Sequence, residues 1–164
     1  RLLFVFIGGG LGREQIERAK RERGMTNLVT LPYQPLSRLR HSLSAATVHV
    51  VAMGNSMVGI VHPSKIYGAM AVARPILALA PKTSHVAELV ASERIGWVVS
   101  HGDVDGAIRA LEEIASAPDH VLQQMGQRAQ EVVRERFDRK TLIERFGHAL
   151  ADPVRARDAV RTSE

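Results

Sequence analysis

A proline, a serine and a lysine stand together where the chain passes from a loop into a helix. Pro63 suits the first turn of a helix over residues 64–72, because the N–H that proline lacks is not needed there. The N–H groups of Ser64, Lys65 and Ile66 would then have no carbonyl partners at the positive end of the helix dipole, and the Lys65 ammonium adds a full charge. These residues predict an anion site. The competing interpretation is an ordinary helix start with a solvated lysine.

A glycine-rich turn over Gly8–Gly12 follows the first apolar segment of the chain. Glycines between a strand and a helix let the backbone approach a phosphate or a sugar closely. The turn does not spell the dinucleotide motif G-x-G-x-x-G, because Arg13 stands where the third glycine would be. No acidic residue ends the next strand, as ribose binding by NAD would require. A nucleotide-binding turn and a tight turn without a ligand both stay open.

Histidine is the other residue type that could do chemistry here. His62 directly precedes the proline turn and could hydrogen-bond a phosphate oxygen, or could face water at the entry of the helix. His49 lies in a strand pattern and is expected in the core or at an interface. The histidines show no metal-binding spacing, and cysteine is absent, so no metal is expected; they are His41, His49, His62, His85, His101, His120 and His148.

Strand and helix patterns alternate along the chain. Strands are expected at residues 2–7, 27–31, 48–52, 76–80 and 96–99, and helices at 13–23, 36–46, 64–72, 85–92, 103–116, 118–137 and 138–157. Short connections in this alternation predict an α/β, Rossmann-like domain with an open parallel sheet and helices on both faces. Ligands of such sheets bind beyond the carboxyl ends of the strands. The loops to examine are therefore 8–12, 32–35, 53–64 and 80–85.

The apolar run at residues 2–7 is typical of a strand buried on both faces of a sheet. Because the chain opens inside this strand, we expect further polypeptide upstream. We also expect a donor-nucleotide domain over residues 1–150 and a helical tail over residues 151–164. Met53, Met57 and Met70 are expected to fill gaps in the core.

Composition limits the class of protein. The 164 residues carry a net charge of +5, with 4% aromatics and no cysteine. Widely spaced aromatic residues argue against single-stranded nucleic acid as a partner. No apolar segment is long enough to cross a membrane, and nothing supports a secretory signal or a disulfide scaffold. A cytoplasmic setting is expected.

The segment from Gly59 to Pro75, set between two strands, resembles the donor-binding signature of family 4 glycosyltransferases with the GT-B fold. The resemblance extends over most of the chain. The glycine turn, the strand and loop at residues 27–35, the Leu43–Val48 entry to the next strand and the Gly96–Asp103 segment match that domain in order. The proline-serine-lysine turn is most similar to transferases that build bacterial surface polysaccharides, including those for colanic acid and O-antigen.

This resemblance implies the C-terminal half of a retaining, metal-independent, hexosyltransferase-type enzyme that needs no cofactor. Its substrate would be a UDP- or GDP-sugar, and its partners an N-terminal acceptor domain outside these residues and an acceptor glycan or lipid-linked sugar. That domain could hold the enzyme at the inner face of the membrane. Lys65 would stabilise the leaving group, and the donor would contact residues in four loops: Gly8, Gly9, Gly10, Tyr33, Gln34, Gly54, Asn55, Ser56, His62, Pro63, Ser64, Lys65 and Gly68.

The chain departs from the family pattern in two ways. Ile60 and Gly68 occupy the places of a glutamate pair, and a basic pair on a preceding strand lies outside the chain. Two alternatives stay open beside the transferase. One is a non-catalytic nucleotide- or ligand-binding domain of the same architecture. The other is half of a nucleotide-sugar epimerase, whose acid and base residues have no clear place in this sequence.

Overall fold

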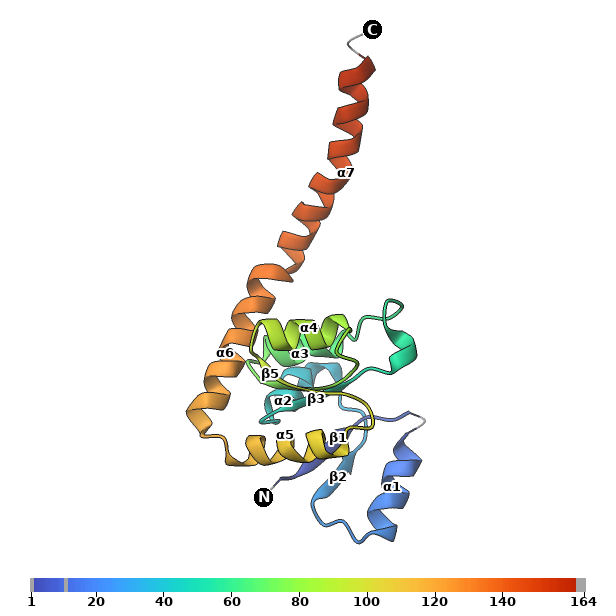
Figure 1. Ribbon diagram of the computed structural model, residues 1–164, viewed down its shortest axis with the longest axis vertical. Helices are drawn as coiled ribbons and strands as arrows, with labels where there is room; N and C mark the ends of the chain where they lie inside the picture. The colour runs from blue at the N-terminus through green and yellow to red at the C-terminus, as the bar shows by residue number, and fades with distance from the viewer. Residues whose placement is uncertain (1, 11, 162–164) are drawn as a thin grey trace.

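The structure is a computed structural model that describes residues 2–10 and 12–161, with the side chains of the last helix described as far as residue 151. Strands and helices alternate along the chain (Figure 1). In chain order they are β1 (Phe4–Ile7), α1 (Arg13–Glu22), β2 (Leu28–Leu31), the short 3-10 turn η1 (Leu36–Arg38), α2 (Leu39–Ser44), β3 (His49–Ala52), the 3-10 turn η2 (Asn55–Met57), α3 (Lys65–Ala71), β4 (Ile76–Leu79), α4 (His85–Ser92), β5 (Gly96–Val99), α5 (Val104–Ser116), α6 (Asp119–Arg136) and α7 (Arg139–Arg161). The predicted α/β class is confirmed.

All strand pairs in the described part of the chain are parallel, but they form two sheets instead of the one that was expected. β4 lies between β3 and β5 in a three-stranded sheet, with Ile76 opposite His49 on one side and Gly96 on the other. β1 pairs only with β2, with Phe4 opposite Leu28. Among the described residues, each sheet therefore has two edge strands, β1 and β2 in one and β3 and β5 in the other.

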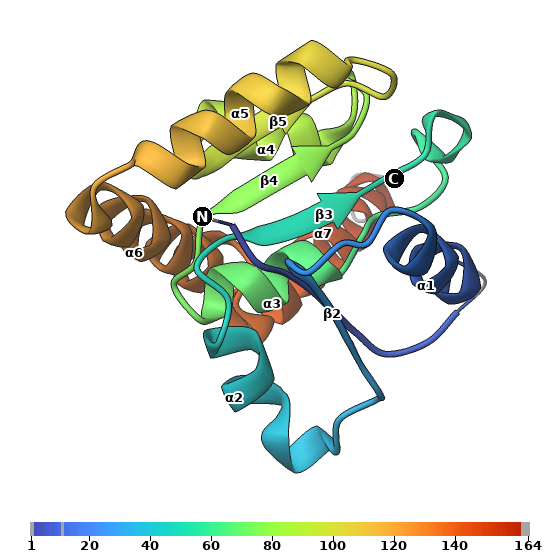
Figure 2. The same cartoon turned by 90° about the horizontal axis from the view of Figure 1, so that it is seen from below.

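Helices cover both faces of the three-stranded sheet (Figure 2). On one face α3, α4 and α6 enclose the larger core, where Ile66 and Met70 of α3 pack with Ile76 and Ala78 of β4. On the other face α5 packs through Ala110 and Ile114 on Leu77 and Val99. Alternate residues of β4 thus enter opposite cores, because successive side chains of a strand point to opposite faces.

The prediction that the first strand is buried on both faces is wrong. Val5, Phe6 and Ile7 are 48%, 43% and 44% exposed. The N–H groups of Phe4 and Gly8 donate to the carbonyls of Asn27 and Leu31, at the two ends of β2. The backbone groups of Val5 and Ile7 alternate with these and therefore point away from β2. An apolar strand is buried only when strands and helices cover it, and β1 has a single neighbouring strand among the described residues.

Two helices also differ from expectation. The helix expected over residues 36–46 begins as η1 and becomes α2 only at Leu39. Leu36 and Leu39 are 84% and 48% exposed, so packing does little to support a longer helix. At the other end α7 is continuous from Arg139 to Arg161 and projects away from the body (Figure 1). The proposed domain boundary at residue 150 lies inside it and stays a prediction.

None of the helices in the described residues combines the length and the apolar character that a membrane crossing requires.

Candidate anion-binding site at the ends of the strands

A cavity of about 210 Å³ lies at the end of β1. It brings together two segments that the sequence singled out separately, the glycine turn and the first residue of α3. The polar and backbone groups around it belong to Gly8, Gly9, Gly12, Arg13, Thr30 and Lys65, and Phe6, Ile7 and Ile16 supply its apolar wall. The cavity therefore joins backbone that can approach a ligand closely with two positively charged side chains, those of Arg13 and Lys65.

The turn after β1 is shaped by its glycines and by one tyrosine. Gly8 and Gly10 have φ angles of +118° and +126°, which favour glycine. The ring of Tyr33, from the loop after β2, lies over the turn so closely that a Cβ on Gly9 would be 3.0 Å from Tyr33 Cε2. Tyr33 is 77% exposed. Its neighbour Gln34 donates from Nε2 to the Pro32 carbonyl at 3.0 Å, which shapes that loop locally.

The start of α3 differs in one respect from the expected cluster of three unpaired donors. The Ile66 N–H donates to the Pro63 carbonyl at 3.3 Å, closing a tight turn. Ser64 precedes the helix and its side chain makes no capping hydrogen bond. Ser64 and Lys65 are exposed, so the site's strongest group on this side is the Lys65 ammonium.

His62 belongs to a cluster of rings with Tyr67, His85 and Phe137. Its Nε2 lies 2.5 Å from the Tyr67 hydroxyl, and its ring centroid lies 4.7 Å from that of His85. Burial, and then the charge of His85, lowers the pKa of His62, while burial raises the pKa of Tyr67. The ring of Tyr67 packs in turn against that of Phe137, with ring centroids 4.8 Å apart and the ring planes tilted by 49°. His62 does not line the cavity, and its contact with a phosphate stays a prediction.

The loop after β3 lies at the same ends of the strands but does not line the cavity. Gly54, Asn55 and Ser56 are exposed there, and the loop is tied down where His101 Nε2 lies 2.6 Å from the Met53 carbonyl oxygen. Among the methionines, Met53 and Met70 are buried as expected; Met57 is 44% exposed, and its expected core position is wrong because η2 turns it outward.

The two positions of the missing glutamates differ in their surroundings. Ile60 is 78% exposed. A Cβ on Gly68 would lie 3.3 Å from Leu43 Cδ1, so this glycine lets α3 pack closely on α2. Neither position presents a carboxylate to a ligand.

Sequence reasoning missed Arg13, which begins α1 and lines the cavity. Its Nη1 donates to the Gly8 carbonyl at 2.9 Å. It also missed the hydrogen bond from the Thr30 hydroxyl to the Glu17 carboxylate, which is the main reason that the pKa of Glu17 is lowered. The signal for Arg13 was its place directly after the last glycine of the turn.

The described residues hold no group of three or more histidine, cysteine or carboxylate side chains that could bind a metal ion.

No protein-family model matches this chain. A search among curated proteins finds two relatives whose matches cover most of this chain. It is 27% identical over 143 residues to the probable glycosyltransferase WbjE of Pseudomonas aeruginosa, covering 87% of this chain. It is 22% identical over 146 residues to the putative colanic acid biosynthesis glycosyl transferase WcaI of Escherichia coli, covering 88%. The chain spans 35% of the length of each relative.

A solved structure matches the same part of the chain. TarM from S. aureus, crystallised as a mutant with fondaparinux, alpha-GlcNAc-glycerol and UDP, superposes with a TM-score of 0.66 at 19% identity. The match covers 89% of this chain and 28% of TarM. The fold is that of a GT-B glycosyltransferase domain. The resemblance to GT-B glycosyltransferases is therefore confirmed, and this GT-B domain has two relatives that are themselves named glycosyltransferases.

Proposed function

We propose that this GT-B domain binds the nucleotide-sugar donor of a glycosyltransferase in bacterial surface-polysaccharide synthesis. Support for the biological setting comes from the relative that is named for colanic acid biosynthesis, and both relatives are named glycosyltransferases. The donor would be a UDP- or GDP-sugar, and its transfer would be retaining, independent of metal and of any cofactor, as in family 4.

The observation that carries this proposal is that Lys65 and the Gly8–Gly9 backbone line one cavity although they come from distant segments. Parallel sheets bind ligands at the carboxyl ends of their strands, which is where the cavity lies. Tyr33 covers the glycine turn and is exposed enough to offer its ring to a base. Gln34, Gly54, Asn55, Ser56 and His62 remain proposed donor contacts around it.

The chemistry requires stabilisation of a leaving group. In glycosyl transfer the bond between the anomeric carbon and a diphosphate oxygen breaks, and the electron pair of that bond stays on the oxygen. Negative charge on the diphosphate therefore grows in the transition state. The ammonium of Lys65 would stabilise this charge without a metal ion.

We propose that the domain works with a second domain that binds the acceptor. Support comes from the lengths of the relatives, of which this chain spans about a third. The free edges of β1 and β3, with Val5, Ile7 and Val50 about half exposed, offer further polypeptide a place to pair. The acceptor would be a glycan or lipid-linked sugar, with the enzyme in the cytoplasm at the inner face of the membrane.

Nucleotide titration of the 164-residue chain tests the proposal. UDP or GDP should shift the amide signals of Gly9, Tyr33 and Lys65. Shifts confined to the other end of the strands, near Arg94 or residues 23–25, would contradict it.

A variant pair tests the role of Lys65 in the longer enzyme. Lys65→Met keeps the apolar stem and removes the charge, and a desolvated contact of this kind contributes on the order of 2–4 kcal/mol in the transition state, or roughly 30- to 1000-fold in kcat. Lys140→Met, on the exposed face of α7, is the matched control. Near-normal kcat in Lys65→Met would remove the basis for the leaving-group role.

The second candidate is a domain that binds a nucleotide but transfers nothing. The apolar Ile60 and the packed Gly68, where the resembling enzymes carry carboxylates, favour it. Assays of the longer protein with nucleotide sugars separate the two functions. The isolated 164 residues should bind nucleotide weakly and show no turnover, because they lack an acceptor domain.

A further inference from the structure

We infer that Arg13 is the second cation of the cavity and binds the same diphosphate group as Lys65, while holding the glycine turn in shape. This inference rests on the proposed function. It adds a binding residue that neither the motifs nor the resemblance assigns.

The position of Arg13 links it to both the turn and the cavity. It is half-buried at the start of α1 and donates from Nη1 to the Gly8 carbonyl at 2.9 Å. A guanidinium carries five N–H donors in a rigid planar fork. One contact with Gly8 fixes the fork beside the turn, and the remaining donors are free to bind oxygens of a ligand in the cavity.

The charges around the cavity leave a positive excess. Arg13 and Lys65 both line it, and neither belongs to an ion pair in the described part of the chain. Glu17, one turn further along α1, receives a hydrogen bond from Thr30. The charge of Arg13 also contributes to the lowered pKa of Glu17, so this carboxylate offsets part of the positive charge and leaves that of Lys65 uncompensated. Two cations in one small cavity repel each other unless an anion lies between them. The arrangement thus favours a ligand with more than one negative charge.

The size of the cavity indicates which part of the donor it would hold. Sites that enclose drug-sized ligands measure roughly 300–1000 Å³, whereas this cavity measures about 210 Å³. It suits a diphosphate better than a complete nucleotide sugar. The base and the sugar would extend from it, the base toward Tyr33.

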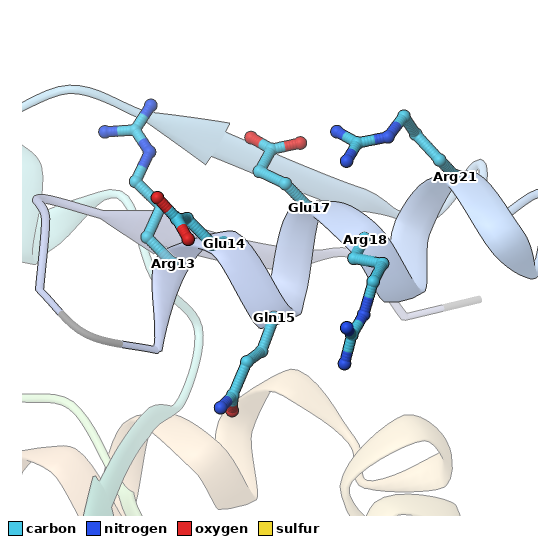
Figure 3. A pocket seen from close by; sticks show the side chains of 6 residues that line it. All are labelled: Arg13, Glu14, Gln15, Glu17, Arg18 and Arg21. Atoms are coloured by element: carbon cyan, nitrogen blue, oxygen red, sulfur yellow. The ribbon is translucent and has the colours of Figure 1, made fainter.

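The other arginines of α1 provide a matched control. Figure 3 shows a pocket along α1 that Arg13 and Arg18 both line, with the two side chains pointing to different sides of the helix. The side chain of Arg18 is 68% exposed, lies 3.9 Å from Glu22 and does not line the cavity at the glycine turn. Arg18→Gln and Arg13→Gln change the net charge of the protein equally, so a difference in ligand affinity between the two variants is due to where the lost charge lies.

The test measures binding of inorganic pyrophosphate and of UDP to the 164-residue chain by calorimetry. Arg13→Gln should weaken both by about tenfold or more, as expected for a charge-assisted contact. Arg18→Gln should change them by less than about twofold. Arg13→Lys, which keeps the charge but loses the fork, should lie between the wild type and Arg13→Gln.

A measurement on the wild type covers the case in which Arg13→Gln fails to fold. The NMR signal of Arg13 Nε–H should move when pyrophosphate is added, and that of Arg18 should not. An unmoved Arg13 signal at saturating pyrophosphate would overturn the inference.

The outcomes separate this inference from the proposed function. If pyrophosphate binds with the predicted dependence on Arg13 but UDP does not bind, the inference stands and the nucleotide function fails. If UDP binds equally well to Arg13→Gln and Arg18→Gln, the function stands and the inference fails. If neither compound binds to the wild type, both fail.

Discussion

Gly126 sits where α6 packs on the segment that connects α3 to β4, so replacing it should push the two apart. Gly126 is buried, and a Cβ there would lie 2.6 Å from the Ala73 carbonyl carbon and 3.2 Å from the Arg74 nitrogen, with the Ala73 oxygen closer still. These are backbone atoms, which cannot turn aside as a side chain can. Gly126→Ala must therefore push α6 away from the segment that follows α3.

The magnitude follows from two opposing effects. Overpacking a well-filled core costs up to about 3 kcal/mol. Alanine in place of glycine inside a helix contributes about 1 kcal/mol in the other direction. The free energy of unfolding should fall by about 2 kcal/mol, which lowers Tm by about 4–8 °C for a chain of this size.

Urea and thermal unfolding followed by circular dichroism measure this change. Gly147→Ala is the control, since no atom lies within 4 Å of a Cβ at Gly147 in α7. It should leave Tm unchanged or raise it slightly. A Gly126→Ala protein as stable as the wild type would refute the claim that α6 meets backbone at this position.

Three further outcomes are expected. Burial lowers the pKa of His49 below 6.5, although a hydrogen bond to the Leu43 carbonyl acts in the opposite direction. The free energy of unfolding that depends on neutral His49 is therefore fully present above pH 6.5 and declines as pH falls through the lowered pKa of the folded state. His49→Gln should reduce the pH dependence of urea unfolding, and an unchanged dependence would contradict this. Ser84 is fully buried and accepts a hydrogen bond from the Ala87 N–H, so Ser84→Ala should lower stability by about 1 kcal/mol in the same assay. In α7, where Phe146 and Leu150 are 67% and 58% exposed, amides beyond Arg145 should exchange much faster than those of β4, and strong protection there would mean that α7 packs on its own domain.

Local signals in the sequence were enough to predict most of the elements. The strand at residues 96–99 and the helix at residues 85–92 have the predicted bounds. β5 has one neighbouring strand but is covered by α4 on one face and by α5 on the other, and four residues of α4 are buried, so that pattern and packing agree. Ser84 caps the helix, as its place before the apolar stripe would suggest.

The errors fall where burial depends on partners that a local pattern does not reveal. Residues 2–7 read as a buried strand because they are apolar throughout, yet β1 has one neighbouring strand and Phe6 is 43% exposed. Leu36 and Leu39 follow the helical period, but they are exposed and the helix is broken. Periodicity shows which face could be buried; only the strand order and the packing helices decide whether it is.

The candidate site shows the same division between local and distant information. Lys65 was recognisable because proline and serine beside it mark a helix start, which is a local signal. From the sequence, Arg13 was considered only as the residue that stands in place of the third glycine of the dinucleotide motif. In that motif the third glycine permits close packing of the helix on the strand. The structure gives this arginine another task, since its guanidinium reaches back to the Gly8 carbonyl at the rim of the cavity that Lys65 lines. The residue that breaks the dinucleotide motif thus places a second positively charged side chain at the cavity, and it is this placement, with Lys65 opposite the glycine turn, that the proposed anion site depends on.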